Sequence, residues 1–171
     1  MDFLPPFSNF RNEVSGTITS YRINQSQIEN TERPALVFLH GFNGSSKSWA
    51  CQFAHFTGQT VIAIDAPGFG ESQPVDGGMV AIADEVAALI ASLVTGKVVI
   101  IGHSMGGMLA QVLGATHPDI CQAIILSCTH KGRAQPVGSP LGAAVQERIQ
   151  QREVMDDASY GALRVSKMLS G

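Results

Sequence analysis

The sequence of 171 residues has little charge and no apolar stretch long enough to cross a bilayer. Charged residues make up 15% of the chain, and a net charge of −3 gives no basic face for nucleic acid or an anionic membrane. The N-terminus lacks the basic and then apolar regions of a secretion signal, and no apolar run approaches the ~20 residues of a membrane span. We therefore expect a cytoplasmic protein with no nucleic-acid or membrane partner.

Cysteine is scarce, and the sequence holds no pattern typical of a metal or cofactor site. Cys51, Cys121 and Cys128 form no CxxC pair, so we expect reduced and mostly buried thiols. Histidines and carboxylates show no ligand-like spacing, and no GxGxxG motif follows an early strand. We expect no metal and no cofactor.

The sequence is instead rich in short apolar runs without polar alternation. Such runs are typical of strands buried on both faces, as in a parallel sheet. They occupy residues 35–39, 61–64, 98–101 and 123–126, and a β-branched segment at 16–24 predicts one more strand.

Helical periodicity separates these runs. It is clear at residues 78–94 and 105–117 and weaker at 45–56, and residues 141–169 read as further helices. Alternating strands and helices predict an α/β fold with a predominantly parallel sheet and helices on both faces.

The motif Gly102-His103-Ser104-Met105-Gly106 matches G-x-S-x-G and stands between a predicted strand and a predicted helix. A tight turn there would hold the serine in a strained conformation, and the two glycines would remove clashing side chains. We predict Ser104 as a nucleophile. The alternative is a glycine-rich turn without a nucleophile.

A second motif, His40-Gly41-Phe42, follows the run at 35–39. A turn at this place can aim a backbone N–H at the oxyanion of a tetrahedral intermediate, with the N–H of Met105 as the second donor. We assign Phe42 as the first donor. His40 is interpreted as a histidine that braces the loop by hydrogen bonding.

A third motif, from Asp65 to Ser72, reads Asp-Ala-Pro-Gly-Phe-Gly-Glu-Ser and follows the run at 61–64. Proline and glycine at these places predict a sharp turn. We expect Asp65 to cap or brace that turn and not to act as a catalytic acid.

In this order, the three motifs resemble the α/β-hydrolase superfamily, in its branch of cap-bearing esterases and enol-lactonase-like hydrolases. The resemblance covers residues 33–130 and implies that the four apolar runs are the third to sixth strands of an eight-stranded sheet. Residues 1–130 would be the N-terminal part of the core, and residues 131–171 the start of a helical cap. The implied function is hydrolysis of a carboxylic ester, lactone or related acyl bond of a small molecule, with Ser104 as nucleophile.

The resemblance also implies missing parts. In that family the acid and the histidine of the triad follow the seventh and eighth strands, and the sequence holds neither strand. His103 adjoins Ser104 but is expected to point elsewhere. His130 is the histidine expected to border the site, either as a surrogate base or only at its rim.

An unpaired edge of the incomplete sheet would favour self-association. Two alternatives to an acyl hydrolase remain open. One is a catalytically inactive fragment or binding module, and the other is a C–C hydrolase or perhydrolase on the same fold.

Overall fold

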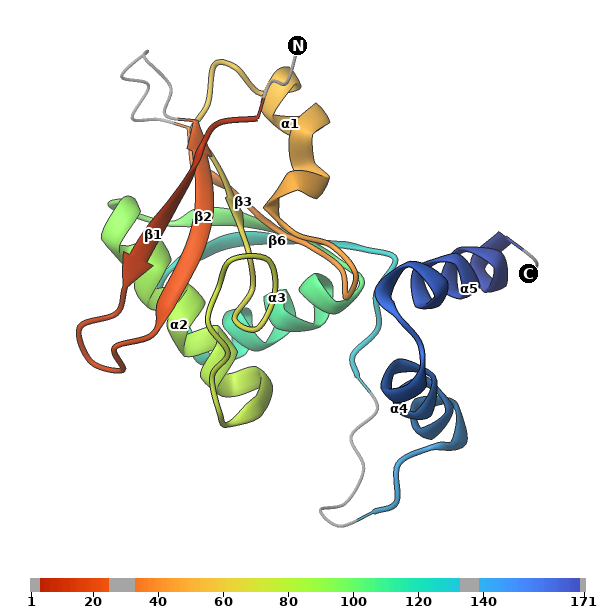
Figure 1. The fold of residues 1–171 in the computed structure, drawn as a ribbon. Helices are drawn as coiled ribbons and strands as arrows, with labels where there is room; N and C mark the ends of the chain where they lie inside the picture. Colours follow the sequence, from red (N-terminus) through yellow and green to blue (C-terminus); the bar gives the residue numbers. More distant parts are fainter. Residues whose placement is uncertain (1–3, 25–32, 133–138, 170–171) are drawn as a thin grey trace. The chain divides into compact units, whose positions relative to one another are not determined.

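The computed structural model describes residues 4–24, 33–132 and 139–169. They divide into two units, Met1–Gly132 and Arg133–Gly171. The first unit is built on a sheet flanked by helices, and the second is a pair of helices (Figure 1).

The sheet of the first unit has six strands in the order β1-β2-β4-β3-β5-β6. The strands β3, β4, β5 and β6 are parallel, whereas β1 and β2 run antiparallel at one edge. This confirms the predicted, predominantly parallel sheet, with the four apolar runs as its third to sixth strands. The bounds are β1 (Phe7–Arg11), β2 (Ile18–Asn24), β3 (Leu36–Leu39), β4 (Val61–Ile64), β5 (Val98–His103) and β6 (Cys121–Ser127).

Helices cover both faces of the sheet, as predicted. The helices α2 (Gly78–Leu93) and α3 (Met105–Thr116) pack on one face, because their apolar residues recur every three or four positions. This core includes Val37, Ile62, Val86, Leu89, Ile90, Ile100, Leu109 and Leu113.

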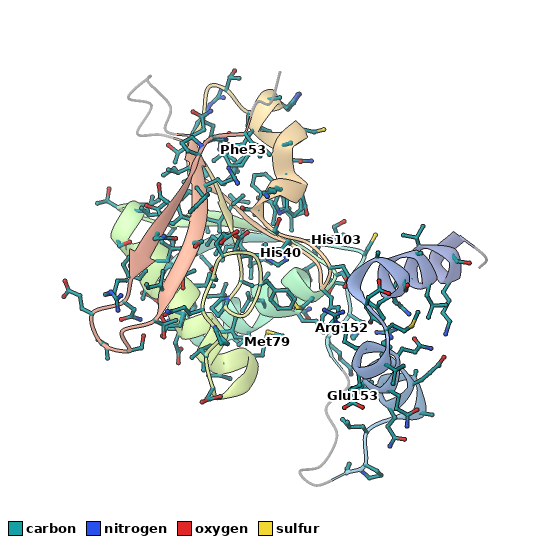
Figure 2. All side chains as sticks on the ribbon, viewed as in Figure 1. His40, Phe53, Met79, His103, Arg152 and Glu153 are labelled. Atoms are coloured by element: carbon teal, nitrogen blue, oxygen red, sulfur yellow. The ribbon has the colours of Figure 1, made fainter. Side chains whose placement is uncertain are left out.

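The opposite face carries the 3₁₀ turn η1 (Ser46–Trp49) and the short helix α1 (Ala50–His55). Phe53 of α1 packs there against Leu36 and Phe38 of β3 (Figure 2). The weak helical pattern at 45–56 is therefore a tight turn followed by a helix of six residues.

The last strand, β6, departs from the prediction that every apolar run is buried on both faces. All residues of β3 and β4 are buried, but Ile125 and Leu126 of β6 are 53% and 48% exposed. Ile124 packs against Gly114 of α3, so Ile125 faces the other side. These residues are exposed because β6 is the edge strand: in the described part of the chain, no strand lies beyond it.

The cysteines also depart from the expectation. All three are free, but Cys51 and Cys128 are exposed, because one lies on the outer side of α1 and the other follows the edge strand. Only Cys121 is partly covered, and this burial raises the pKa of its thiol.

The second unit consists of α4 (Ala143–Val154) and α5 (Asp157–Leu169), which confirms the helices expected at 141–169. Lys167 Nζ lies 2.7 Å from Glu147 Oε1, and this contact lowers the pKa of Glu147. The guanidinium of Arg152 lies 5.5 Å from the centre of the Tyr160 ring. None of the helices in the described ranges is both long and apolar enough to cross a membrane.

Candidate active site

Ser104 stands in the turn between β5 and α3 with φ 52° and ψ −112°. Non-glycine residues rarely adopt positive φ, and such strain is typical of active sites. The Ser104 N–H donates to the Ser127 carbonyl at 2.9 Å, and the Ser104 carbonyl accepts from Gly107 N–H at 3.0 Å. Within the described residues, the hydroxyl of Ser104 has no hydrogen-bond partner.

Glycines let three backbone segments meet at this turn. A Cβ on Gly102 would lie 2.6 Å from the Cα of Gly107, and a Cβ on Gly106 would lie 2.6 Å from the His40 carbonyl oxygen. A Cβ on Gly41 would lie 2.9 Å from His103 Nδ1 and 3.4 Å from Ser104 Cβ. The loop after β3 therefore packs directly against the turn at Ser104.

The loop after β3 closes with a hydrogen bond from Gly44 N–H to the Gly41 carbonyl at 2.9 Å. Phe42 lies inside this turn, and Met105 begins α3. Over the described ranges, neither the Phe42 N–H nor the Met105 N–H has a protein acceptor. These two N–H groups are therefore the candidate donors beside the turn at Ser104.

The imidazole of His40 is buried, with 1% of its surface exposed. Its Nε2 accepts the N–H of Ala66 at 3.1 Å, so Nδ1 carries the proton and donates to the Gly41 carbonyl at 2.8 Å. Burial lowers the pKa of His40, opposed in part by that carbonyl and by the charge of Asp65. Both ring nitrogens are engaged, so this neutral histidine braces the loop and has no lone pair for proton transfer.

Asp65 is 3% exposed and binds two loops. Its carboxylate accepts the N–H of Ser46 at 2.5 Å and the N–H of Glu71 at 3.2 Å. This confirms that Asp65 braces its turn, and it also holds the residues that follow the His40 loop.

The two other histidines near the turn differ in their contacts. His40 and His103 lie at the same end of the sheet (Figure 2), and the exposed His103 ring lies over Gly41. The exposed His130 accepts the N–H of Gly132 at its Nδ1, at 2.9 Å. None of the hydrogen bonds among the described residues links His130 to the Ser104 hydroxyl.

The structure therefore brings Gly41, Phe42, His103 and Met105 together around Ser104, and it leaves the His130 ring bonded elsewhere. One contact of the turn had no signal in the sequence: the hydroxyl of Thr129 donates to the Ser104 carbonyl at 2.6 Å. The described residues contain no group of three or more His, Cys, Asp or Glu side chains that could hold a metal ion.

Comparison with known proteins finds a matching family and several similar proteins. The family described as alpha/beta hydrolase fold matches residues 34–157. The chain is 33% identical over 116 residues to the sn-1-specific diacylglycerol lipase ABHD11 of Mus musculus. The aligned region covers 66% of this chain and 38% of that protein. It is 36% identical over 102 residues to the putative 2-succinyl-6-hydroxy-2,4-cyclohexadiene-1-carboxylate synthase of Bacillus subtilis, covering 57% of this chain and 37% of that one.

Among solved structures, a thermophilic esterase from Thermogutta terrifontis is 27% identical, with a TM-score of 0.68 over 86% of this chain and 52% of the esterase. The chain spans less than half the length of the two curated relatives described above.

Proposed function

Because the chain belongs to the alpha/beta hydrolase fold family, we propose that it provides the nucleophile and the oxyanion hole for hydrolysis of a carboxylic ester, lactone or related acyl bond of a small molecule. One observation carries the proposal. Ser104 is held in a strained turn with an unengaged hydroxyl, beside the unsatisfied N–H groups of Phe42 and Met105. The names of the relatives, a lipase and an esterase, support the same class of reaction.

In the proposed reaction, Ser104 Oγ attacks the carbonyl carbon, and the N–H groups of Phe42 and Met105 stabilise the oxyanion. Each donor of this kind lowers the barrier by about 3 kcal/mol. The bond to the leaving oxygen then breaks, the alcohol leaves with a proton, and water hydrolyses the acyl ester on Ser104.

Full activity requires a base that takes the proton of the Ser104 hydroxyl. His40 is engaged at both nitrogens and the Nδ1 of His130 accepts from Gly132. Oxyanion donors without a working triad leave a rate of about 10³-fold over water. We therefore propose that the chain alone shows Ser104-dependent but slow turnover.

The apolar rim suggests the kind of acyl group. Phe42 is 58% exposed, and its ring meets the Phe69 ring edge-on at 5.7 Å between centroids. An apolar acyl or alcohol group would cover these rings, so we expect apolar esters to be preferred over charged ones.

The direct test is labelling of the purified chain with a fluorophosphonate, followed by peptide mass mapping. We expect one adduct on Ser104, no adduct in Ser104→Ala, and parent-like labelling in Ser92→Ala, a control serine on α2. Equal labelling of Ser104→Ala and the parent would remove Ser104 from the mechanism. If the parent neither labels nor turns over an aryl ester, the chain is a non-catalytic fragment or binding module.

A second candidate, favoured by the 36% identity to the Bacillus subtilis protein, is the carboxylate synthase reaction for which that protein is named. Two assays separate the two reactions. An acyl adduct on Ser104, trapped by an acid quench during aryl-ester turnover, supports hydrolysis, whereas formation of the named cyclohexadiene carboxylate from the substrate of that Bacillus subtilis protein supports the synthase. Activity on a vinylogous diketone, or on peroxide with a carboxylic acid, would support C–C hydrolysis or perhydrolysis.

We also propose a cytoplasmic location, because three free cysteines suit a reducing compartment. Fractionation of cells that express the tagged chain tests this, and recovery with secreted protein would contradict it.

A further inference from the structure

Two non-glycine residues in the described part of the chain have positive φ: Ser104 at 52° and Cys128 at 48°. They follow the parallel neighbours β5 and β6, and the Ser104 N–H donates to the carbonyl of Ser127 at 2.9 Å. Strained backbone persists only where its surroundings determine it. The turn at Cys128 is therefore part of the structure that surrounds the nucleophile.

The turn at Cys128 brings Thr129 against the first turn of α3. Thr129 Oγ1 lies 2.6 Å from the Ser104 carbonyl oxygen and 3.5 Å from the carbonyl oxygen of His130, so Ser104 is its main acceptor. A Cβ on Gly107 would lie 2.6 Å from the Cβ of Thr129. The absence of a side chain at Gly107 is what admits Thr129 to this position.

Gln111 of α3 holds the same segment from its other end. Its Nε2 donates to the carbonyls of Gly107 and His130, both at 3.1 Å. The segment after β6 is therefore bonded to α3 at two places, and the Thr129 hydroxyl is the contact that reaches the nucleophile residue itself.

The peptide bond between Ser104 and Met105 links this contact to the chemistry. A peptide unit is planar, so the carbonyl of Ser104 and the N–H of Met105 point in opposite directions in one plane. A donor that fixes the Ser104 oxygen therefore also fixes the direction of the Met105 N–H.

We propose that Thr129 is a positioning residue: its hydroxyl orients the Ser104–Met105 peptide and hence the oxyanion donor of Met105. The effect on reactivity rests on the proposed function, whereas the effect on the peptide does not. The Thr129 side chain contacts no reacting atom, and it acts through the Ser104 carbonyl.

Two substitutions separate the hydroxyl from packing. Thr129→Val keeps the branched shape and removes the donor, and Thr129→Ser keeps the donor and removes the methyl group. We expect Thr129→Val to lower the rate of fluorophosphonate labelling at Ser104 by about tenfold, less than the 10²–10³-fold loss of a whole oxyanion donor. Thr129→Ser should label at the parent's rate.

The second measurement is by NMR on the full chain and does not need activity. In Thr129→Val, the Met105 amide resonance should shift and the Gly107 and Met108 amides, which donate to the Ser104 carbonyl, should exchange faster with solvent. Thr129→Ser should keep the parent's values. If Thr129→Val does not fold, Thr129→Ala replaces it in the comparison.

Parent-like resonances and labelling in Thr129→Val would overturn the proposal, and so would equal impairment of Thr129→Val and Thr129→Ser, which would assign the effect to packing. If the parent is never labelled but its Met105 amide responds to Thr129→Val and not to Thr129→Ser, the proposed function fails and the positioning role stands.

Discussion

The carboxylate of Asp65 and the backbone N–H of Ser46 are joined by a hydrogen bond of 2.5 Å, which links the loop after β4 to the turn that follows the His40 loop. In Asp65→Asn, one of the two carboxylate oxygens becomes an NH₂ group that faces a backbone N–H. We expect the free energy of unfolding to fall by about 1–3 kcal/mol, the cost of a buried unsatisfied group. Urea denaturation measures this, and Asp76→Asn, at an exposed carboxylate, should change it by less than about 0.5 kcal/mol. Equal effects would contradict the bracing role of Asp65.

Gly106→Ala should be among the most damaging small substitutions in the chain. Its methyl group would lie 2.5 Å from the Leu39 carbonyl carbon, and backbone cannot move aside as a flexible side chain can. We expect a loss of about 3 kcal/mol or more in unfolding free energy, measured by urea denaturation. Gly58→Ala is the matched control, because a Cβ there meets nothing within 4 Å. A Gly106→Ala chain as stable as this control would show that the turn at Ser104 is packed less tightly than these distances indicate.

Stability should fall between pH 7.5 and pH 5 in part through His40. Burial lowers the pKa of His40 below its ordinary value of 6.5, so the unfolded chain binds this proton more readily than the folded chain. The contribution of neutral His40 to the free energy of unfolding is complete above pH 6.5. It is lost as the pH falls toward the pKa of His40 in the folded chain. Urea denaturation at both pH values should show a smaller pH dependence in His40→Asn, and His55→Asn, at an exposed histidine, should keep the parent's dependence. An unchanged dependence in His40→Asn would rule out this linkage.

The three thiols should react in a defined order. Burial, with the nearby Asp119 charge, raises the pKa of Cys121, so less of it is thiolate at pH 8. Iodoacetamide labelling followed by peptide mass mapping should modify the exposed Cys51 and Cys128 before Cys121. In urea the three rates should converge. Early labelling of Cys121 in the folded chain would mean that β6 opens readily.

Self-association should depend on the edge strand β6. Ile125 is 53% exposed there, and the strand carries no charged residue to discourage pairing with a second copy. We expect Ile125→Lys to lower the oligomeric fraction measured by size-exclusion chromatography with light scattering. Val80→Lys is the matched control, since Val80 on α2 is also 53% exposed. If both variants associate as the parent does, β6 is not the contact.

The centre of the fold could be predicted because burial leaves a simple pattern. A strand such as Val61–Ile64 is covered on both faces and reads as an unbroken apolar run. β1 could not be predicted, because four of its five residues are exposed and its place depends on pairing with β2. The burial of β6 was predicted wrongly for a related reason. Its apolar composition is typical of a buried strand, but the exposure of a strand depends on which elements lie beside it.

The turn at Ser104 could be predicted because steric demands restrict its glycines to fixed spacings around that residue. The contacts of single polar side chains are different. Which nitrogens of His40 are engaged depends on Ala66, 26 residues away, and the bond from Thr129 to Ser104 spans 25 residues. Such partners come together only when the sheet has folded. A single threonine after a strand belongs to no sequence motif, so its hydrogen bond could not be predicted.

The strand order also has a consequence for the growing chain. β3 lies between β4 and β5, and both follow it in the sequence. At synthesis rates of about 5–20 residues per second, Leu36–Leu39 waits roughly 3–13 s before the end of β5 has been made. During that time a segment that is fully buried in the finished sheet lacks its neighbour β5. The middle of the sheet is therefore closed only after both strands that flank β3 have been made.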